Sequence, residues 1–473
     1  MKPKLAIFTK FCEDLLPIEL AYVQQNAAFK DEDLLHILNV LLEQKNKVKA
    51  EYNFDVKIDK RKYSFFKTWV QELLEDTDVD IALHKIQQFD AKVQTDSITN
   101  TEEKELVKAA SSIDNTYYHF QRFYELMLHF RQYLLIRMRM KNYQLINQWI
   151  EQYKNNYSES LRVYNMLHEL SGEIISEYGL SNHTDVGVES SLQEIFDNDD
   201  LDGLNRYAAA VRLWFYYMNK GEYIKMAKLL EDVEQLLILK KYLGRRLIVN
   251  YYANRLLLHS KTSELEKARY YGYLSLKYPT NDYLFYVINL SSVLLRLGLP
   301  KEAMQHMKDA FPVMRSTLDM HNKIGFVAHY VHCLIDLGNY KEATKFAENY
   351  LGSHLKEVMS TRWHLFFAAY FRSLVLLNNF PRVLLMAKRY KLKEKEMQYA
   401  TKAHYLPTMS WYISLAEFME GDIDENTAIE KMKSSALILI NDPVRGIRIA
   451  EQLKQLQSQV PDLIKKLRSE LKM

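Results

Sequence analysis

A short frame, Gly, two variable residues and then Lys-Glu-Ala, occurs twice in this sequence, at residues 298–303 and again at 338–343. Breaks between helix-period segments recur at a similar distance after residue 116. These breaks are at Lys141, Gly221, Ser263, Gly298, Gly338, Asn378 and Gly421. A period of about 40 residues that contains two helices is typical of a helical solenoid, in which each helix pair packs on its neighbours.

The periodic pattern predicts about eight helix pairs over residues 116–440. The predicted pairs are 117–140 and 142–155, 157–179 and 186–197, 204–219 and 222–238, 245–260 and 263–277, 282–297 and 300–316, 322–337 and 340–355, 360–377 and 380–393, and 403–419 and 424–440. Glycine suits the breaks because it accepts positive φ. Small residues five positions later, Ala268, Ala303 and Ala343, let the two helices of a pair approach closely.

The two ends of the chain do not follow this period. Residues 441–473 are predicted to form a C-terminal capping helix, because the last repeat of a solenoid has no neighbour to cover it. Residues 1–115 are expected to be a helical N-terminal region, either a separate domain or an irregular start of the array. Helices are expected there at 31–44, 63–75, 81–90 and 99–110. Alternating apolar residues over 52–58 also allow a short strand or an extended segment.

The length of the chain indicates either several domains or an elongated repeat array. The chain has 473 residues, whereas a single hydrophobic core stops growing at about 250–300 residues. Only 13 glycines and 9 prolines occur, so few residues interrupt long helices. We therefore expect an all-α protein.

The turns resemble those of the tetratricopeptide-repeat (TPR) family. The matching residues are Leu297-Gly298 with Glu302-Ala303 and Ala310, Leu337-Gly338-Asn339-Tyr340 with Glu342-Ala343, the turns Gly221-Glu222-Tyr223 and Gly421-Asp422-Ile423, and Pro279 after a second helix. The resemblance covers residues 116–440, with repeats of about 40 residues instead of the family's about 34. It implies a right-handed α-α superhelix whose concave groove is lined by the first helix of each pair.

That resemblance also implies which side chains line the groove. The candidate groove residues are polar positions on the predicted first helices: Arg212, Asn250, Asn254, Asn289, Ser292, Arg296, His329, His332 and Arg372. The family's best-known groove grips a C-terminal carboxylate with a Lys and an Asn. The matching positions here hold Ile288 and Ser292, Ala328 and His332, and Val211 and Phe215. Binding of a carboxylate tail by that clamp is therefore not expected.

Charge and cysteine content narrow the class of partner and the compartment. The net charge of +3 and the pI of about 8.4 are too balanced for a typical nucleic-acid-binding protein. Cys12 and Cys333 are too few for a disulfide framework and are expected to be buried, unreactive residues. The sequence has no uninterrupted stretch of about 18 apolar residues, so no membrane span is predicted. The first residues do not resemble a signal peptide. We therefore expect a cytoplasmic protein that does not enter a membrane.

Two acidic segments have part of the spacing of a calcium loop. Asp76, Asp78 and Asp80 match the first three ligand positions, but Gln87 stands where a bidentate Glu is needed. In the segment 198–203 the acids match better, yet Ala209 occupies the bidentate position. These acids are therefore expected to cap helices, and no metal site is predicted.

No segment carries a recognisable catalytic or nucleotide-binding motif. His329 and His332 have a metal-compatible spacing, but no HExxH motif or cysteine pair accompanies them. The chain lacks GxxxxGK[ST], GxGxxG and GxSxG. We therefore predict no cofactor and no enzymatic activity.

The expected function is that of a protein–protein interaction scaffold that binds a peptide or a partner protein along the concave groove. The alternative is a peptide-responsive TPR-type regulator that uses the N-terminal helical region, residues 1–115, as its effector. A hydrolase with catalytic residues in the groove ranks third.

Overall fold

The computed structural model describes residues 5–45, 47, 51–179, 187–239, 242–400 and 405–472. Within these residues the regular elements are α-helices and no strand occurs, which confirms the all-α prediction. An isolated bridge pairs Asp78 with Leu243, and the segment 52–58 is not a strand. The chain divides into two compact units, Met1–Tyr251 and Tyr252–Met473. The boundaries expected from the sequence at 115/116 and 440/441 stay predictions.

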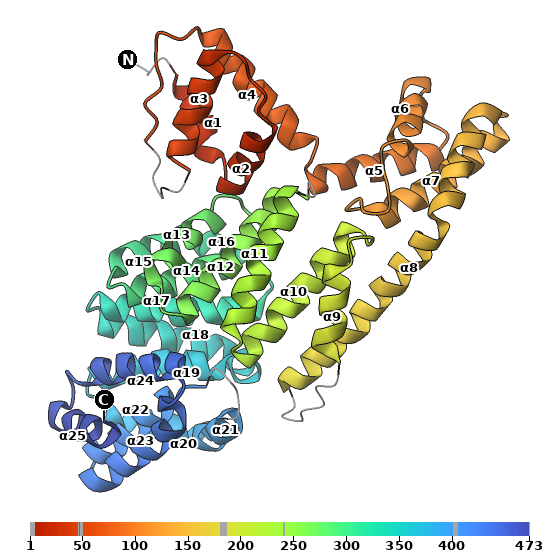
Figure 1. Ribbon diagram of the computed structural model, residues 1–473. Helices are drawn as coiled ribbons and strands as arrows, with labels where there is room; N and C mark the ends of the chain where they lie inside the picture. The colour runs from red at the N-terminus through yellow and green to blue at the C-terminus, as the bar shows by residue number, and fades with distance from the viewer. Residues whose placement is uncertain are drawn as a thin grey trace. The chain divides into compact units, whose positions relative to one another are not determined.

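The N-terminal unit contains eleven described helices and the start of a twelfth (Figure 1). They are α1 (Ala6–Asp14), α2 (Pro17–Asn26), α3 (Glu32–Glu43), α4 (Lys60–Glu75), α5 (Val79–Gln94), α6 (Asn100–Ala110), α7 (Phe120–Ile136), α8 (Met140–Gly179), α9 (Val188–Asp197), α10 (Gly203–Lys220), α11 (Tyr223–Leu239) and α12 (Arg245–Lys261).

The C-terminal unit continues from α12 through thirteen further described helices (Figure 1). They are α13 (Leu265–Ser275), α14 (Tyr283–Arg296), α15 (Pro300–Asp309), α16 (Phe311–Ser316), α17 (Met320–Asp336), α18 (Tyr340–Ser360), α19 (Trp363–Leu376), α20 (Phe380–Arg389), α21 (Leu392–Tyr399), α22 (Thr408–Met419), α23 (Glu425–Ile440), α24 (Pro443–Leu456) and α25 (Pro461–Leu471).

Most predicted helices occur close to their expected ends, with two kinds of difference. The predicted helices 142–155 and 157–179 are one helix, α8, because no Gly or Pro lies between them. The predicted second helices 300–316 and 380–393 are each broken in two, before Phe311 and at Lys391. Lys391 adopts a left-handed φ of 51°, which ends the hydrogen-bonded run.

Six of the seven breaks identified by the period adopt a left-handed backbone conformation. Their φ values lie between 56° and 83°, at Gly221, Ser263, Gly298, Gly338, Asn378 and Gly421. At Gly338 the backbone N–H donates to the carbonyl of Ile335, and the next N–H, of Asn339, donates to Leu334, both at 2.9 Å. This pair of bonds is the Schellman motif that ends helices. The seventh break was misplaced: Lys141 lies inside α8, and Met138 has the left-handed φ of 57°.

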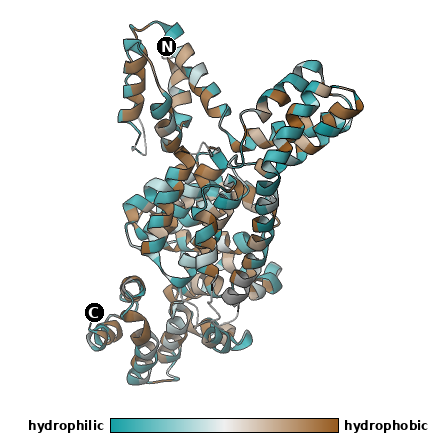
Figure 2. Cartoon of the chain, turned by 45° about the vertical axis from the view of Figure 1, so that its right-hand side comes forward, coloured by the Kyte–Doolittle hydropathy of each residue, from teal (hydrophilic) through white to brown (hydrophobic). Residues whose placement is uncertain are grey.

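Helices of the C-terminal unit pack in a regular order along the chain. The first helices of the successive pairs contact one another in the sequence α14, α17, α19 and α22, and each also contacts its own second helix. A single apolar cluster runs from Leu256 to Leu471 through this stack. Figure 2 shows that most of the helices carry hydrophilic and hydrophobic residues side by side, as expected for amphipathic helices.

Small residues lie where the two helices of a pair meet. Ala268, Ala303 and Ala343, the positions predicted from the repeat, are fully buried. Met226 and Val383 take the same place in two other pairs and are fully buried too, so these pairs accommodate a larger side chain at the crossing.

Within the N-terminal unit, residues near position 245 contact the first helices of the chain. The guanidinium of Arg245 donates to the carboxylate of Glu19 at 2.8 Å, and Glu19 also accepts the backbone N–H of Leu16 at 2.8 Å. The Val79 N–H donates to the carbonyl of Leu243 at 2.7 Å. Residues 1–115 therefore share polar contacts with the last segment of their own unit.

The repeated turn predicts opposite effects of one substitution at two glycines. Gly338→Ala should lower the free energy of unfolding by about 1 kcal/mol, because a Cβ disfavours the left-handed conformation. Gly352→Ala should raise it by up to about 1 kcal/mol, because Gly352 lies on an exposed helical surface. An added Cβ meets no atom within 4 Å at either site, so sterics do not differ. Urea unfolding followed by circular dichroism measures both, and two shifts of the same sign would contradict the assigned turn.

Candidate functional site: a polar cavity in the C-terminal unit

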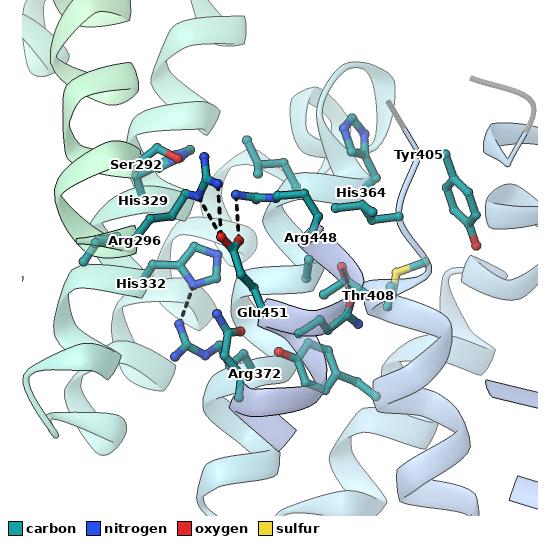
Figure 3. Close-up of a pocket in the computed structure, with 18 of the residues that line it drawn as sticks. Ser292, Arg296, His329, His332, His364, Arg372, Tyr405, Thr408, Arg448 and Glu451 are labelled. Atoms are coloured by element: carbon teal, nitrogen blue, oxygen red, sulfur yellow. Dashed lines mark hydrogen bonds and ion pairs between the residues drawn. The ribbon is translucent and has the colours of Figure 1, made fainter. Parts of the chain in front are cut away.

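A cavity of ≈ 340 Å³ lies among the helices of the C-terminal unit (Figure 3). Its walls come from the row of first helices, from α21 and from α24. The lining residues used below are Ser292 and Arg296 of α14, His329, His332 and Asp336 of α17, Ala368 and Arg372 of α19, Glu396 of α21, Tyr405, Thr408 and Tyr412 before and on α22, and Arg448, Glu451 and Gln452 of α24. Helices that are far apart in the sequence thus contribute polar groups to one space.

The predicted capping segment forms two helices with different positions. Pro461 begins α25, which packs on α23 and covers the end of the array with Leu463, Ile464 and Leu467. The preceding helix, α24, begins after the N-cap Asp442, whose carboxylate accepts the N–H groups of Val444 and Arg445 at 2.9 Å. Only the second helix matches the predicted cap, whereas α24 forms one wall of the cavity.

An amphipathic pattern fixes which side of α24 faces the cavity. Ile449, Leu453 and Leu456 are buried in the apolar cluster of the unit. Arg448, Glu451, Gln452 and Gln455 share another face, since their spacings of three and four residues place them on adjacent turns. The helix thus inserts its apolar side into the core and presents charged and amide groups to the cavity.

Glu451 is shared between two arginines (Figure 3). The Nε and Nη2 atoms of Arg296 donate to Oε1 at 3.2 and 3.0 Å, and Arg448 Nη1 lies 3.2 Å from Oε2. Arg296 also donates to the carbonyl of Ser260 at 2.7 Å. The side chain of Arg296 is only 10% exposed, so this ion pair between α14 and α24 is shielded from solvent.

A second polar chain crosses from α17 to α19. Arg372 donates from Nη2 to Asp336 at 2.7 Å. Its Nη1 donates to Nδ1 of His332 at 3.3 Å (Figure 3). A guanidinium can only donate, so Nδ1 of His332 accepts and the imidazole is neutral with its proton on Nε2. Burial, and then the charge of Arg372, holds the pKa of His332 well below its ordinary value.

His329 carries the opposite tautomer. Its Nδ1 lies 2.9 Å from the carbonyl oxygen of Gly325, which can only accept, so Nδ1 bears the proton and Nε2 keeps a lone pair. Burial is the main cause that lowers the pKa of His329 to about 4. His329 and His332 are therefore neutral near pH 7 and differ in the ring nitrogen that can donate.

Two strongly buried side chains of the cavity have a polar atom without a partner among the described residues. Glu396, 6% exposed, accepts from the hydroxyl of Tyr405 at 3.2 Å and the N–H of Ser410 at 3.3 Å through Oε1, while Oε2 has no partner. Burial raises the pKa of Glu396, which favours its protonated form. Gln452, 5% exposed, accepts from Thr408 at 3.1 Å, while its Nε2 has no partner.

The structure brings five of the nine candidate groove residues together and leaves four outside. Ser292, Arg296, His329, His332 and Arg372 line the cavity. The remaining four are Arg212, which donates to the carbonyl of Leu167 in the N-terminal unit, Asn250, which accepts from Tyr207 there, Asn254 on α12, and Asn289 on α14, whose Nδ2 has no partner among the described residues. These four do not line the cavity.

The sequence also missed residues that the cavity uses. Glu396 lies on α21, which follows the break in a predicted second helix. Tyr405 lies in the loop before α22, at the edge of a predicted first helix. The other three are on α24: Arg448, Glu451 and Gln452. A local signal existed only for α24, in its amphipathic pattern. No signal indicated that this helix meets Arg296, which lies several helices earlier in the chain.

The acidic segments and the two cysteines can be compared directly with their expected roles. Asp78 and Asp202 cap α5 and α10, as expected from the helix-cap interpretation of the acidic segments. Cys12 and Cys333 are fully buried, and burial raises the pKa of both thiols. Among the described residues, no group of three metal-ligating side chains comes together, and no helix is long and apolar enough to cross a membrane.

The tautomer of His329 predicts a pH effect with a defined sign. Its folded pKa of about 4 lies below the ordinary value of about 6.5, so the unfolded chain takes up the proton first as the pH falls. The stabilisation by neutral His329 is complete above about pH 6.5 and is lost toward pH 4, which amounts to about 2 kcal/mol between pH 7 and pH 5.

His329→Asn keeps a donor near the Gly325 carbonyl but cannot titrate. The difference in unfolding free energy between pH 7 and pH 5 should therefore be smaller in this variant than in the original protein by about 2 kcal/mol. Other titrating groups, such as Glu396, act equally in both proteins and cancel. Identical pH profiles from urea unfolding would show that His329 is not held neutral.

No protein-family model, no curated protein and no solved structure matches this chain, so its function is argued from the cavity and the arrangement of helices around it.

Proposed function

We propose that the C-terminal unit is a TPR-like right-handed superhelix and that the protein is an interaction scaffold that binds a peptide, or an extended segment of a partner protein, in the cavity. The supporting feature of the fold is the repeated turn: Schellman motifs recur at nearly regular intervals and separate helices that pack in order. In TPR-like arrays the inner surface is formed by first helices, and the cavity is lined by α14, α17 and α19.

One observation carries the binding proposal. Successive first helices place Arg296, His332 and Arg372 around a space of ≈ 340 Å³. Buried polar atoms of Glu396 and Gln452, which also line it, have no partner among the residues that the structure describes. A buried polar group that lacks a hydrogen bond costs roughly 1–3 kcal/mol, so a ligand that supplies donors and acceptors is favoured there. A peptide backbone offers both kinds of group at regular spacing.

The same residues do not assemble a catalytic arrangement. His329 and His332 are neutral, and their hydrogen bonds go to a backbone carbonyl and a guanidinium instead of a nucleophile. The third histidine of the lining, His364, lies with its Nε2 2.7 Å from the hydroxyl of Tyr399. The carboxylate of Asp336 is held by one arginine and that of Glu451 by two. The proposal therefore assigns recognition and no bond-breaking step to the cavity.

A cavity-filling variant tests the proposal. Peptides would be selected on the purified full-length protein from a displayed random library, and their dissociation constants measured by fluorescence anisotropy. Ala368→Phe places a ring in the cavity and should weaken the selected peptides at least tenfold. Ser353→Phe adds a ring on the exposed surface of α18, outside the cavity, and should change affinity less than twofold.

Circular dichroism and the unfolding midpoint verify that both variants remain folded. Selected peptides that bind the Ala368→Phe protein as well as the original would remove the cavity from the proposal. A library that yields no binder would remove peptide recognition itself.

A further inference from the structure

Two arginines of the cavity share one carboxylate. Arg372 and Asp336 form a pair, but Glu451 is shared by Arg296 and Arg448. Lys261, on α12, lies near enough to Arg448 and Arg296 for their charges to lower its pKa, in addition to the larger effect of burial. Two arginines therefore meet at one carboxylate, and the charge of Lys261 adds to their mutual repulsion.

The positive charge of Arg448 is unfavourable at this position. Burial, followed by the charge of Arg296, lowers the pKa of Arg448, so the surroundings disfavour the charged form of this guanidinium. Like charges in a partly desolvated space repel one another, and an additional anion relieves that repulsion. Arg448 is still 38% exposed, so a ligand in the cavity can reach it.

Neutral donors lie beside the cations. Gln452 follows Arg448 by one helical turn on the same face of α24, and its Oε1 is occupied by the hydroxyl of Thr408. Gln452 is 5% exposed and lines the cavity, and its Nε2 has no partner in the described part of the chain. The amide can therefore donate to an oxygen atom placed next to Arg448.

The arginine pair already holds one carboxylate in the required way. Glu451 accepts from two nitrogens of Arg296 through one oxygen and faces Arg448 through the other (Figure 3). Arginine suits such planar, charge-assisted contacts with carboxylate and phosphate oxygens. Glu451 thus occupies part of the space that an external anion of the same geometry would take.

We propose that the cavity binds its ligand through an anionic oxygen group, a carboxylate or a phosphate, held by Arg448 with the amide of Gln452 as a neutral donor, and in competition with Glu451. The inference rests on the proposed recognition of a peptide and names the group that the peptide presents. For a peptide, that group is an acidic side chain, a C-terminal carboxylate or a phosphorylated residue.

Small anions test this site without a peptide. Isothermal titration calorimetry on the full-length protein would use glutarate, inorganic phosphate and the neutral analogue glutaramide. At least one of the two anions should bind, glutaramide should bind at least tenfold more weakly, and added NaCl should weaken the anion. Preference for glutarate assigns the site to carboxylates, and preference for phosphate assigns it to phosphoryl groups.

Matched variants locate the binding. Arg448→Gln should weaken the anion at least tenfold, whereas Arg315→Gln removes one positive charge outside the cavity and should change affinity less than twofold. Gln452→Met keeps the size of the side chain without its donor and should weaken the anion severalfold. Glu451→Gln removes the competing charge and should tighten binding at least threefold.

Equal binding of both anions to the original protein and to the Arg448→Gln variant, or no binding of either anion, would overturn the inference. Unchanged or weaker binding to the Glu451→Gln variant would overturn the competition with Glu451. The peptide experiment can fail independently of the anion experiment. If the selected peptides depend on the cavity but not on Arg448, the scaffold proposal stands and the anion site is wrong. If anions bind through Arg448 but the library yields no peptide, the anion site stands and peptide recognition is wrong.

Discussion

The left-handed turn between the helices of each pair is the constraint on which the C-terminal unit depends. It reverses the chain within a few residues, so the second helix must return along the first and bury its apolar face there. Fully buried Ala303 and Ala343 set how closely the two helices approach. Since each pair also packs on the next, the apolar cluster is continuous, and its open end requires α25 with Leu463, Ile464 and Leu467.

Local chemistry explains why this part of the fold could be predicted from sequence. A Schellman turn needs one residue with positive φ and an apolar helix on each side, and these features recur within a short window. The period located Ser263 and Asn378 as well, although neither is a glycine. The same reasoning failed at Lys141, because the turn residue there is Met138, which no local preference favours. It also failed within α8, since the period demanded a break where the residues allow a continuous helix.

The cavity depends on long-range packing, and this is why its sequence prediction was partial. Polar residues on first helices could be selected by helical period, and five of them meet at the cavity. Glu451 and Gln452 become part of it only because α24 folds back toward α14, and Glu396 because a second helix breaks at Lys391. Neither event follows from the residues that surround these side chains. Arg212 shows the converse, since it satisfies the helical pattern but is occupied by the Leu167 carbonyl in the other unit.

A purely structural role explains some polar groups of the cavity better than others. Arg372 and Asp336 join α17 to α19 at 2.7 Å, which is a sufficient reason for both residues. The group around Glu451 differs, because a second arginine and Lys261 add repulsion that a structural link between α14 and α24 does not need. Ile449 and Leu453 already hold α24 in the core. An anion that binds beside Arg448 lowers this repulsion and stabilises the docked helix, and by linkage the docked helix raises the affinity for the anion by the same factor.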